Sequence, residues 1–313
     1  MSQPVISYIS TVYNKAAYLA ETVDILRKQT GLKGHPVEFV FADDRSSDQS
    51  VEILQGMASE DPRIKVIENQ DNQGPAIRIN QAANAATGRF LLPLDADDML
   101  PGNASRFQLD LAERENVSLI FGRSRRNKGN PNIPIDSQVS LHHDALAFCA
   151  RKQVVHMGFL VNRQLWQRSG GADTNIFIQD QSVPLRLAAA ADRLAWVDEV
   201  IYWLRPAEGG NLSANVIQQH HDRFLSARDL LGRRDITQTA RKALLRQLSS
   251  TIWKLRRDSG VPVPHLSASF LQYLLNRVVA AGPSDTILDR TASMLANLPG
   301  VRRPEKTTKQ GDS

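Results

Sequence analysis

The sequence predicts an α/β protein with a mostly parallel sheet flanked by helices and an all-helical C-terminal extension. In the N-terminal third, β-rich runs alternate with amphipathic segments of about ten to fifteen residues, the pattern of βαβ units with right-handed crossovers. After residue 214, the long segments show helical spacing and no strand-like alternation.

Each element of the N-terminal third has its own signal. The run "VISYIS" predicts a strand at 5–10, and the apolar spacing of "KAAYLAETVDILRKQ" predicts a helix at 15–29. Gly88 ends the helical run that follows "DNQGP", and "FLLPL" then reads as a strand. The remaining strands are expected at 37–42, 64–69 and 90–94, and the remaining helices at 49–58 and 76–87.

Composition limits the class of protein. The chain has 313 residues, 42% hydrophobic and 23% charged, and no apolar run of about 18 residues, so we expect no transmembrane helix. The first residues lack the features of a secretion signal, and Cys149 is the only cysteine, so we expect a cytoplasmic protein without a disulfide. No G-x-G-x-x-G follows the first strand and no P-loop motif is present.

Three polar clusters stand where predicted strands end: "TVYN", "DDRSSD" and "DADD". The carboxyl ends of parallel strands meet at one edge of the sheet, where ligands bind. We therefore expect Asp43, Asp44, Asp95 and Asp97 to converge. Such residues are also common in turns and helix caps, so one cluster alone proves little. Together, they suit Mg²⁺ or Mn²⁺, which prefer oxygen ligands and share them with substrate phosphates.

Four segments in order resemble the inverting family 2 glycosyltransferases of GT-A fold, a Rossmann-like fold. They are "ISYISTVYNKAAYLAETVDILRKQT", "VEFVFADDRSSDQSVEIL", "NQGPAIRINQAANAATGRFLLPLDADD" and "GFLVNRQLWQRSGGADTNIFIQDQSVPLRLA". The resemblance covers about the first 210 residues. It implies transfer of a sugar from a nucleotide diphosphate donor, most simply UDP-linked, to the hydroxyl of a glycan or other acceptor. No nucleic-acid partner is implied.

The resemblance also implies roles for particular residues. Asp180 would be the general base, and Asp97 with Asp95 would hold Mn²⁺ or Mg²⁺ against the diphosphate. The nucleotide sugar would lie against Thr11, Tyr13, Asn14, Asp43, Asp44, Asn80, Asp95 and Ala96.

The chain departs from the family pattern at three places. Gln179 stands before Asp180 where the family commonly has Glu, which removes one carboxylate. Arg78 sits one position early on its helix, which weakens a donor-phosphate role for it. The segment "YWLRPAEGGNLS" lacks the expected histidine, so Glu208 or water would complete a metal site.

Asp180 also has an interpretation independent of the resemblance. The apolar "IFI" delivers this residue to the start of a helical stretch, where free N–H groups and the helix dipole favour a carboxylate. We therefore expect its pKa to lie below the free value of about 3.9, which keeps it ionised as a base. The alternative is a simple helix cap.

The C-terminal region is basic, with 17 Lys or Arg against 9 Asp or Glu from Arg205 onward. We expect a catalytic domain at 1–213, a helical region at 214–298 and a disordered tail at 299–313. The basic, amphipathic "TARKALLRQLSSTIWKLRRD" could lie on an anionic membrane surface or pack on the domain. His220 and His221 are expected on a solvated helix surface.

Three functions fit the sequence to different degrees. The first is a metal-assisted inverting glycosyltransferase. The second is a catalytically degenerate protein that only binds a sugar or nucleotide sugar, favoured by the missing Glu and His. The third is a Mg²⁺-dependent phospho-receiver-like signalling protein, which would leave Asp180 unexplained and is smaller than this domain. The sugar, acceptor, linkage and oligomeric state are not specified by the sequence.

Overall fold

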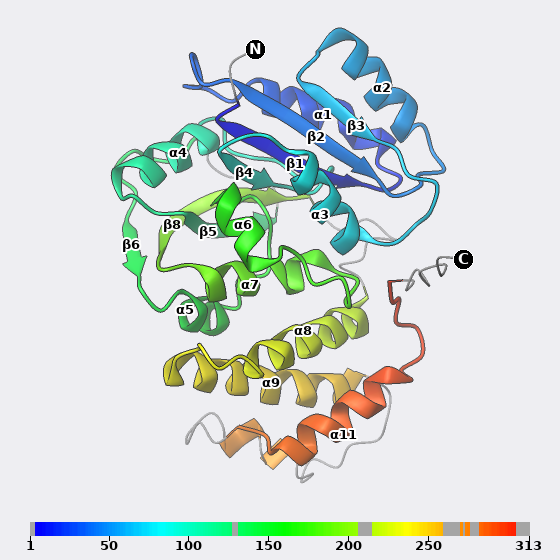
Figure 1. Ribbon diagram of the computed structural model, residues 1–313, viewed down its shortest axis with the longest axis vertical. Coiled ribbons are helices and arrows are strands. Elements are labelled where there is room, and N and C mark those ends of the chain that lie inside the picture. Colours follow the sequence, from blue (N-terminus) through cyan, green and yellow to red (C-terminus); the bar gives the residue numbers. More distant parts are fainter. Residues whose placement is uncertain are drawn as a thin grey trace, which may run out of the picture.

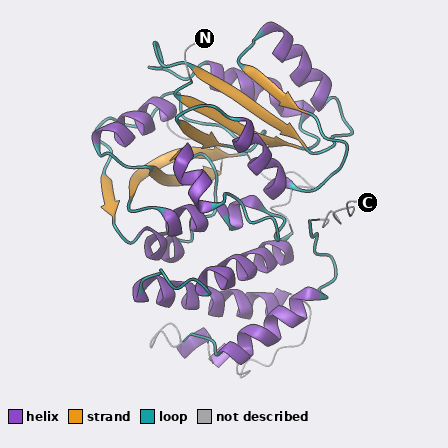
Figure 2. Cartoon of the chain, viewed as in Figure 1, coloured by secondary structure: helices purple, strands orange, loops and turns teal. Residues whose placement is uncertain are grey.

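The computed structural model describes residues 4–126, 131–205, 215–258, 270–271, 273–275 and 282–304. Within that part of the chain an eight-stranded sheet runs in the order β3-β2-β1-β4-β7-β5-β8-β6, flanked by helices (Figures 1 and 2). The strands are β1 (Ile6–Val12), β2 (Val37–Asp43), β3 (Ile64–Ile67), β4 (Phe90–Pro93), β5 (Leu119–Arg126), β6 (Val139–His142), β7 (Leu160–Asn162) and β8 (Leu194–Leu204).

The helices of the first 205 residues alternate with these strands. They are α1 (Ala16–Arg27), α2 (Ser50–Glu60), α3 (Pro75–Ala85), α4 (Ala104–Arg114), α5 (Ala145–Lys152), α6 (Arg163–Ser169), the short 3₁₀ turn η1 (Gln179–Gln181) and α7 (Val183–Ala190). The fold class predicted from the sequence is confirmed, and the four predicted N-terminal strands and three helices form at the expected places.

Strand directions bring the polar clusters to one edge. β1 pairs in parallel with β2 and β4, and β2 pairs in parallel with β3. In that register Val12 lies beside Asp43, and the Leu94 N–H bonds to the Ile9 carbonyl. The turns after β1, β2 and β4 therefore lie side by side, as expected for the carboxyl edge of a parallel sheet. The short β7 and the edge strand β6 are antiparallel to their neighbours.

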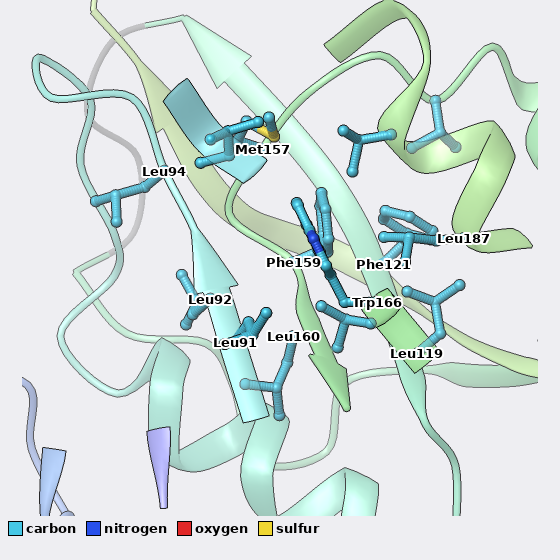
Figure 3. Close-up of a cluster of buried hydrophobic side chains, with 14 of the residues drawn as sticks. Leu91, Leu92, Leu94, Leu119, Phe121, Met157, Phe159, Leu160, Trp166 and Leu187 are labelled. Carbon is cyan, nitrogen blue, oxygen red and sulfur yellow. The ribbon is translucent and has the colours of Figure 1, made fainter. Parts of the chain in front are cut away.

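The core lies between the sheet and its helices. Figure 3 shows part of it, where side chains from the central strands meet those of α6 and α7. The labelled members are Leu91, Leu92, Leu94, Leu119, Phe121, Met157, Phe159, Leu160, Trp166 and Leu187. All are nearly inaccessible to solvent, so this packing fixes the centre of the sheet and the aspartate turn that follows β4.

The C-terminal helices α8 (Val216–Leu231), α9 (Gln238–Asp258) and α11 (Asp285–Ala296) gather at the end of the molecule away from β3 and α2 (Figure 1). α9 packs against α8 and α5. Its apolar side chains, among them Leu244, Leu248 and Leu255, are buried. The apolar face of this basic helix therefore packs on the protein, while Lys242, Arg246 and Arg257 are exposed.

Two expectations for the C-terminal region need correction. His220 and His221 are buried rather than solvated: His220 lies 3.1 Å from Asp258 at the end of α9, and His221 lies 2.7 Å from the buried Asp222. The segment expected to be disordered from residue 299 is ordered at its start, where the Asn215 amide donates to the Gly300 carbonyl and the Arg302 N–H donates to Gln218. Residues 305–313 lie outside the described residues, as do 259–269, 272 and 276–281 within the expected helical region.

None of the helices in the described ranges is long and apolar enough to cross a membrane.

Candidate active site at the carboxyl edge of the sheet

The aspartates that follow β4 lie at the centre of the carboxyl edge. Asp98 is buried, and Asp95 and Asp97 are partly buried. Burial, followed by repulsion from Asp98 and Asp97, raises the pKa of Asp95 well above its ordinary value. Burial likewise raises the pKa of Asp98 to about 6. A cluster of this kind needs cationic or hydrogen-bonding partners to persist.

Two basic residues supply part of that compensation. The Lys15 ammonium, directly after the Tyr-Asn turn, lies 2.5 Å from the Asp97 carboxylate. Arg205 donates to the Asp97 carbonyl at 2.7 Å and pairs with Glu21 at 2.7 Å. Both cations also face the Tyr18 ring. Thus, the residue before α1 and the residue after β8 hold the aspartate turn.

Tyr202 on β8 holds the aspartate turn after β4 through two hydrogen bonds. Its hydroxyl donates to the Asp98 carboxylate at 2.7 Å and accepts from the Asp95 N–H at 3.1 Å. The Arg205 N–H donates to the other Asp98 oxygen at 2.8 Å. Burial raises the pKa of Tyr202 well above its ordinary value, so the hydroxyl keeps its proton and can donate. Asp98 is therefore a structural anchor beneath Asp95 and Asp97.

The turn after β2 is held tightly by its own hydrogen bonds. The Asp43 carboxylate accepts from the Ser46 N–H at 2.9 Å and from the Ser46 hydroxyl. The Asp44 carboxylate accepts from the N–H groups of Gln73 and Gly74 and from Arg78, at 2.8 to 2.9 Å. Arg78 is 4% exposed and also pairs with Asp71. Arg78 is thus committed to the protein, in line with its displaced position in the motif.

The turn after β1 lies beside it. Tyr13 is 44% exposed, so its ring faces the surface at this edge. Asn14 has φ 54°, and its amide oxygen accepts from the Ser47 N–H at 2.8 Å. The Asn14 N–H in turn donates to Ser46 at 2.9 Å. Thr11 is the last residue but one of β1, next to Ala42 of β2. These contacts bind the first two polar clusters into one surface.

Asp180 lies near these aspartates on a different part of the chain, the short turn before α7. It lies in η1, where it is partly buried, and the neighbouring Gln179 amide donates to the Asp95 carboxylate at 2.8 Å. Gln181 donates from its own amide to Asp180 at 3.0 Å. The neutral Gln179, next to Asp180 in the chain, therefore donates to Asp95 at a position where a Glu would repel it.

The predicted direction of the Asp180 pKa was wrong. Burial raises this pKa to about 7, and repulsion from Asp222 and Asp98 adds to the rise. Gln181 and Arg223 lower it by a smaller amount. The turn that carries Asp180 is a three-residue 3₁₀ turn, so the expected gain at a helix start is outweighed by desolvation.

The structure brings most of the expected residues to this edge, but Asn80 is directed elsewhere. Both ends of its amide bond to the backbone of Ala172, each at 2.9 Å. A side chain on Gly171 would lie 2.2 Å from the Asn80 oxygen, so the close approach requires glycine there. Ala96 is buried, and its carbonyl accepts from Thr22 at 2.9 Å. Asn80 ties the segment leading to Asp180 to α3.

Several contributors were not identified from the sequence. Lys15, Tyr202 and Arg205 bond to the aspartate turn from positions 82 to 108 residues away in the chain. Asp222 and Arg223 of α8 bond to the segment around Asp180. Only Lys15 has a local signal, since it follows the Tyr-Asn turn directly; the others become neighbours through tertiary packing.

Comparison with known proteins identifies the family. The family model for "Glycosyl transferase family 2" matches residues 7–191. An uncharacterized glycosyltransferase of Haemophilus influenzae is 30% identical over 122 residues, 39% of this chain and 48% of that protein. The Escherichia coli protein WfgD, named as a UDP-Glc:alpha-D-GlcNAc-diphosphoundecaprenol beta-1,3-glucosyltransferase, is also 30% identical, over 39% of this chain and 46% of its own. Both matches span less than half of the curated relative.

Solved structures agree at the level of the fold. S. aureus TarS residues 1–349, in complex with UDP-GlcNAc, superposes with a TM-score of 0.66 at 18% identity, covering 91% of this chain and 83% of that one. The mannosyltransferase PcManGT of Pyrobaculum calidifontis, in complex with GDP-Man and Mn²⁺, gives 0.57 at 17% identity, with 95% and 86% covered. The family model covers more than half of the chain, and the GT-A fold is confirmed. This chain therefore belongs to glycosyl transferase family 2.

Proposed function

We propose that this protein is an inverting glycosyltransferase that moves a sugar from a nucleotide diphosphate sugar, most simply UDP-linked, to an acceptor hydroxyl. One observation carries the proposal. Two separate carboxylate groups, the Asp95–Asp97 turn and Asp180, lie near one another: Gln179, directly before Asp180 in η1, donates to Asp95, and the charge of Asp180 acts on Asp95. Inversion needs this separation, because the leaving diphosphate and the proton acceptor stand on opposite sides of the anomeric carbon.

The donor set of the aspartate turn fits a hard divalent cation, Mn²⁺ or Mg²⁺. Carboxylate oxygens of Asp97 and Asp95 would hold it, and such ions often combine one or two carboxylates with substrate phosphates and water. When bound, the cation would supply neutralisation of the leaving diphosphate. Within the described ranges, no three His, Cys, Asp or Glu side chains are close enough to hold a metal alone, and Glu208 lies outside those ranges.

The nucleotide binds over the turns after β1 and β2. The exposed Tyr13 ring offers a stacking surface for the base, and Asp43 lies behind it as a hydrogen-bond acceptor. Thr11 and Asn14 complete this wall, and Ala96 brings the backbone close to the ribose. Asp44, bonded by Arg78, orients the same wall from behind.

Asp180 accepts the proton of the attacking hydroxyl. A base with a pKa near the working pH is both ionised often enough and strong enough to take a proton. The Asp180 carboxyl, with its pKa raised to about 7, meets that condition. Its Gln181 neighbour donates to one oxygen, which leaves the other for the acceptor.

A specific observation favours a second candidate, the catalytically degenerate nucleotide-sugar-binding protein. Gln179 stands where the family commonly has Glu, which removes one carboxylate from the segment that carries Asp180. The phospho-receiver alternative has no such support, since the family match extends through residue 191 and includes Asp180.

The acceptor is a glycan or another hydroxyl-bearing molecule, and the protein acts in the cytoplasm. Contact with a membrane surface would use the outward basic side chains of α9 rather than its buried apolar face. Co-sedimentation with anionic and neutral vesicles, at low and high salt, tests that contact. Equal binding to anionic and neutral vesicles at every salt concentration would contradict the proposed membrane contact.

The test of the proposed function is transfer by the purified protein. It is incubated with UDP- and GDP-sugars, Mn²⁺ and a panel of hydroxyl acceptors, and product is measured with its anomeric configuration. We expect inverted product from one donor and loss of turnover with chelator. Donor binding without transfer to any acceptor, at pH 8 where Asp180 is ionised, would favour the degenerate binder.

A further inference from the structure

Helix α8 contains a carboxylate that is entirely buried yet lies outside the proposed site. Asp222 is inaccessible to solvent. Its Oδ2 atom accepts from the backbone N–H groups of Phe177 at 3.1 Å and Ile178 at 2.7 Å. These residues directly precede η1, which carries Asp180. A buried carboxylate persists only where hydrogen bonds replace water, so this contact is specific.

The second oxygen of Asp222 is equally engaged. Its Oδ1 atom accepts from the Gln218 amide at 3.0 Å and lies 2.7 Å from His221 Nδ1. Gln218 also donates to the Arg302 carbonyl and accepts from the Arg302 N–H. The carboxylate is therefore fixed from within α8 and from the chain after α11, and it presents a rigid acceptor to the segment before Asp180.

The next residue on α8 acts on the other side of Asp180. Arg223 donates through Nε to the Gln181 side-chain oxygen at 3.0 Å. A guanidinium can only donate, so it orients the Gln181 amide with its oxygen inward and its NH₂ toward Asp180. That NH₂ donates to the Asp180 carboxylate at 3.0 Å. Arg223 thus sets the orientation of the one side chain seen to bond to Asp180 within the described structure.

Consecutive helix residues point about 100° apart, so one helix can contact both flanks of a short turn. Asp222 bonds to the backbone before the turn, and Arg223 bonds to the side chain after it. The charged groups whose fields reach Asp180 are Asp98, Asp222 and Arg223, and Asp95 is influenced by Asp180 in turn.

We propose that Asp222 and Arg223 are positioning residues that hold Asp180 for catalysis, which makes α8 part of the active site rather than a separate module. This inference rests on the proposed role of Asp180 as base. The geometry assigns them no contact with substrate, so their loss should lower turnover while sparing donor binding. Displacement of a reacting group by about 1 Å can lower the rate about 10²-fold.

The test uses Arg223→Met and Asp222→Asn in the full chain. The matched controls are Arg228→Met and Asp229→Asn, exposed positions on the same helix. Each variant is also combined with Asp180→Asn. We expect kcat to fall roughly 10- to 100-fold in Arg223→Met and Asp222→Asn, with donor Kd and KM within about twofold of the parent and the controls unaffected. In the Asp180→Asn background the same changes should have no further effect.

Two results would overturn the inference. One is parental kcat in folded Arg223→Met; the other is an equal loss of rate from Arg223→Met with and without Asp180→Asn. Arg223 is only partly buried, so this variant decides the matter even where Asp222→Asn fails to fold. A parental rate in Asp180→Asn alone contradicts the proposed base instead, and thereby separates the two failures.

Discussion

Replacement of Asp180 by Asn tests whether this residue acts in sugar transfer and not in donor binding. The change keeps the size of the side chain and an oxygen that can accept from Gln181, but removes the carboxylate. We expect transfer to fall about 10²- to 10⁴-fold, the usual contribution of a general base, with donor and Mn²⁺ affinity retained. Asp192→Asn, at an exposed position after α7, is the matched control.

The pH dependence follows from the raised pKa. The base acts only when ionised, so parental kcat/KM should rise about tenfold per pH unit up to about 7 and then level off. In Asp180→Asn this limb should disappear. The assay is initial-rate transfer from pH 5 to 9 at saturating Mn²⁺. A parental profile in the variant would assign the proton to another group.

Stability gives a second, independent magnitude. The folded pKa of about 7 lies above the free value of 3.8, so the folded state holds the proton longer than the unfolded state. Stability is therefore lost as pH rises from about 4 to 7, by at most about 4 kcal/mol for roughly three pKa units. Asp180→Asn lacks this loss and should melt several degrees above the parent at pH 8, with the gap closing toward pH 4. Equal melting temperatures at all pH values would contradict the buried-charge argument.

Three further predictions concern the donor side. Asp97→Ala should abolish Mn²⁺-dependent thermal stabilisation by UDP, a contribution of several kcal/mol, while the fold survives by circular dichroism; UDP binding that ignores chelator in parent and variant would remove the metal. Asp43→Asn should weaken nucleotide binding about tenfold in calorimetry, and an unchanged Kd would make Asp43 a turn residue only. Lys15→Met removes the ammonium paired with Asp97 and should tighten Mn²⁺ binding without nucleotide roughly fivefold, unlike the exposed Lys28→Met; weaker Mn²⁺ binding would refute a competing role for Lys15.

The sequence predicted the carboxyl edge well because its signals are local. Strand runs and turn residues place Asp43, Asp95 and Asp97 after parallel strands, and parallel pairing alone brings them together. The same reasoning could not assign partners. Asn80 lies on the expected helix, but its amide bonds to the backbone of Ala172, ninety-two residues away.

The pKa of Asp180 shows why local reasoning fails for charges. A helix start is a local feature and lowers a carboxyl pKa by a modest amount. Burial against α8 and the aspartate turn is a tertiary feature and acts in the opposite direction with a larger effect. The buried histidines of α8 are a second example, because polar positions of this helix become interior positions once it packs against α9 and the segment around Asp180.

The repulsion among these carboxylates gives a physical reason for Gln, rather than Glu, at position 179. Asp98 and Asp180 already raise the pKa of Asp95, and Asp98 raises that of Asp180, so a further carboxylate within hydrogen-bonding distance of Asp95 would add repulsion. The amide instead donates to Asp95 and adds no charge. It follows that Gln179→Glu, in the absence of a cation, should raise the pKa of Asp180 further and move the acid limb of kcat/KM to higher pH. An acid limb that stays at the same pH would show that a charge at residue 179 does not affect the titration of Asp180, and the contact of residue 179 with Asp95 would then be structural only.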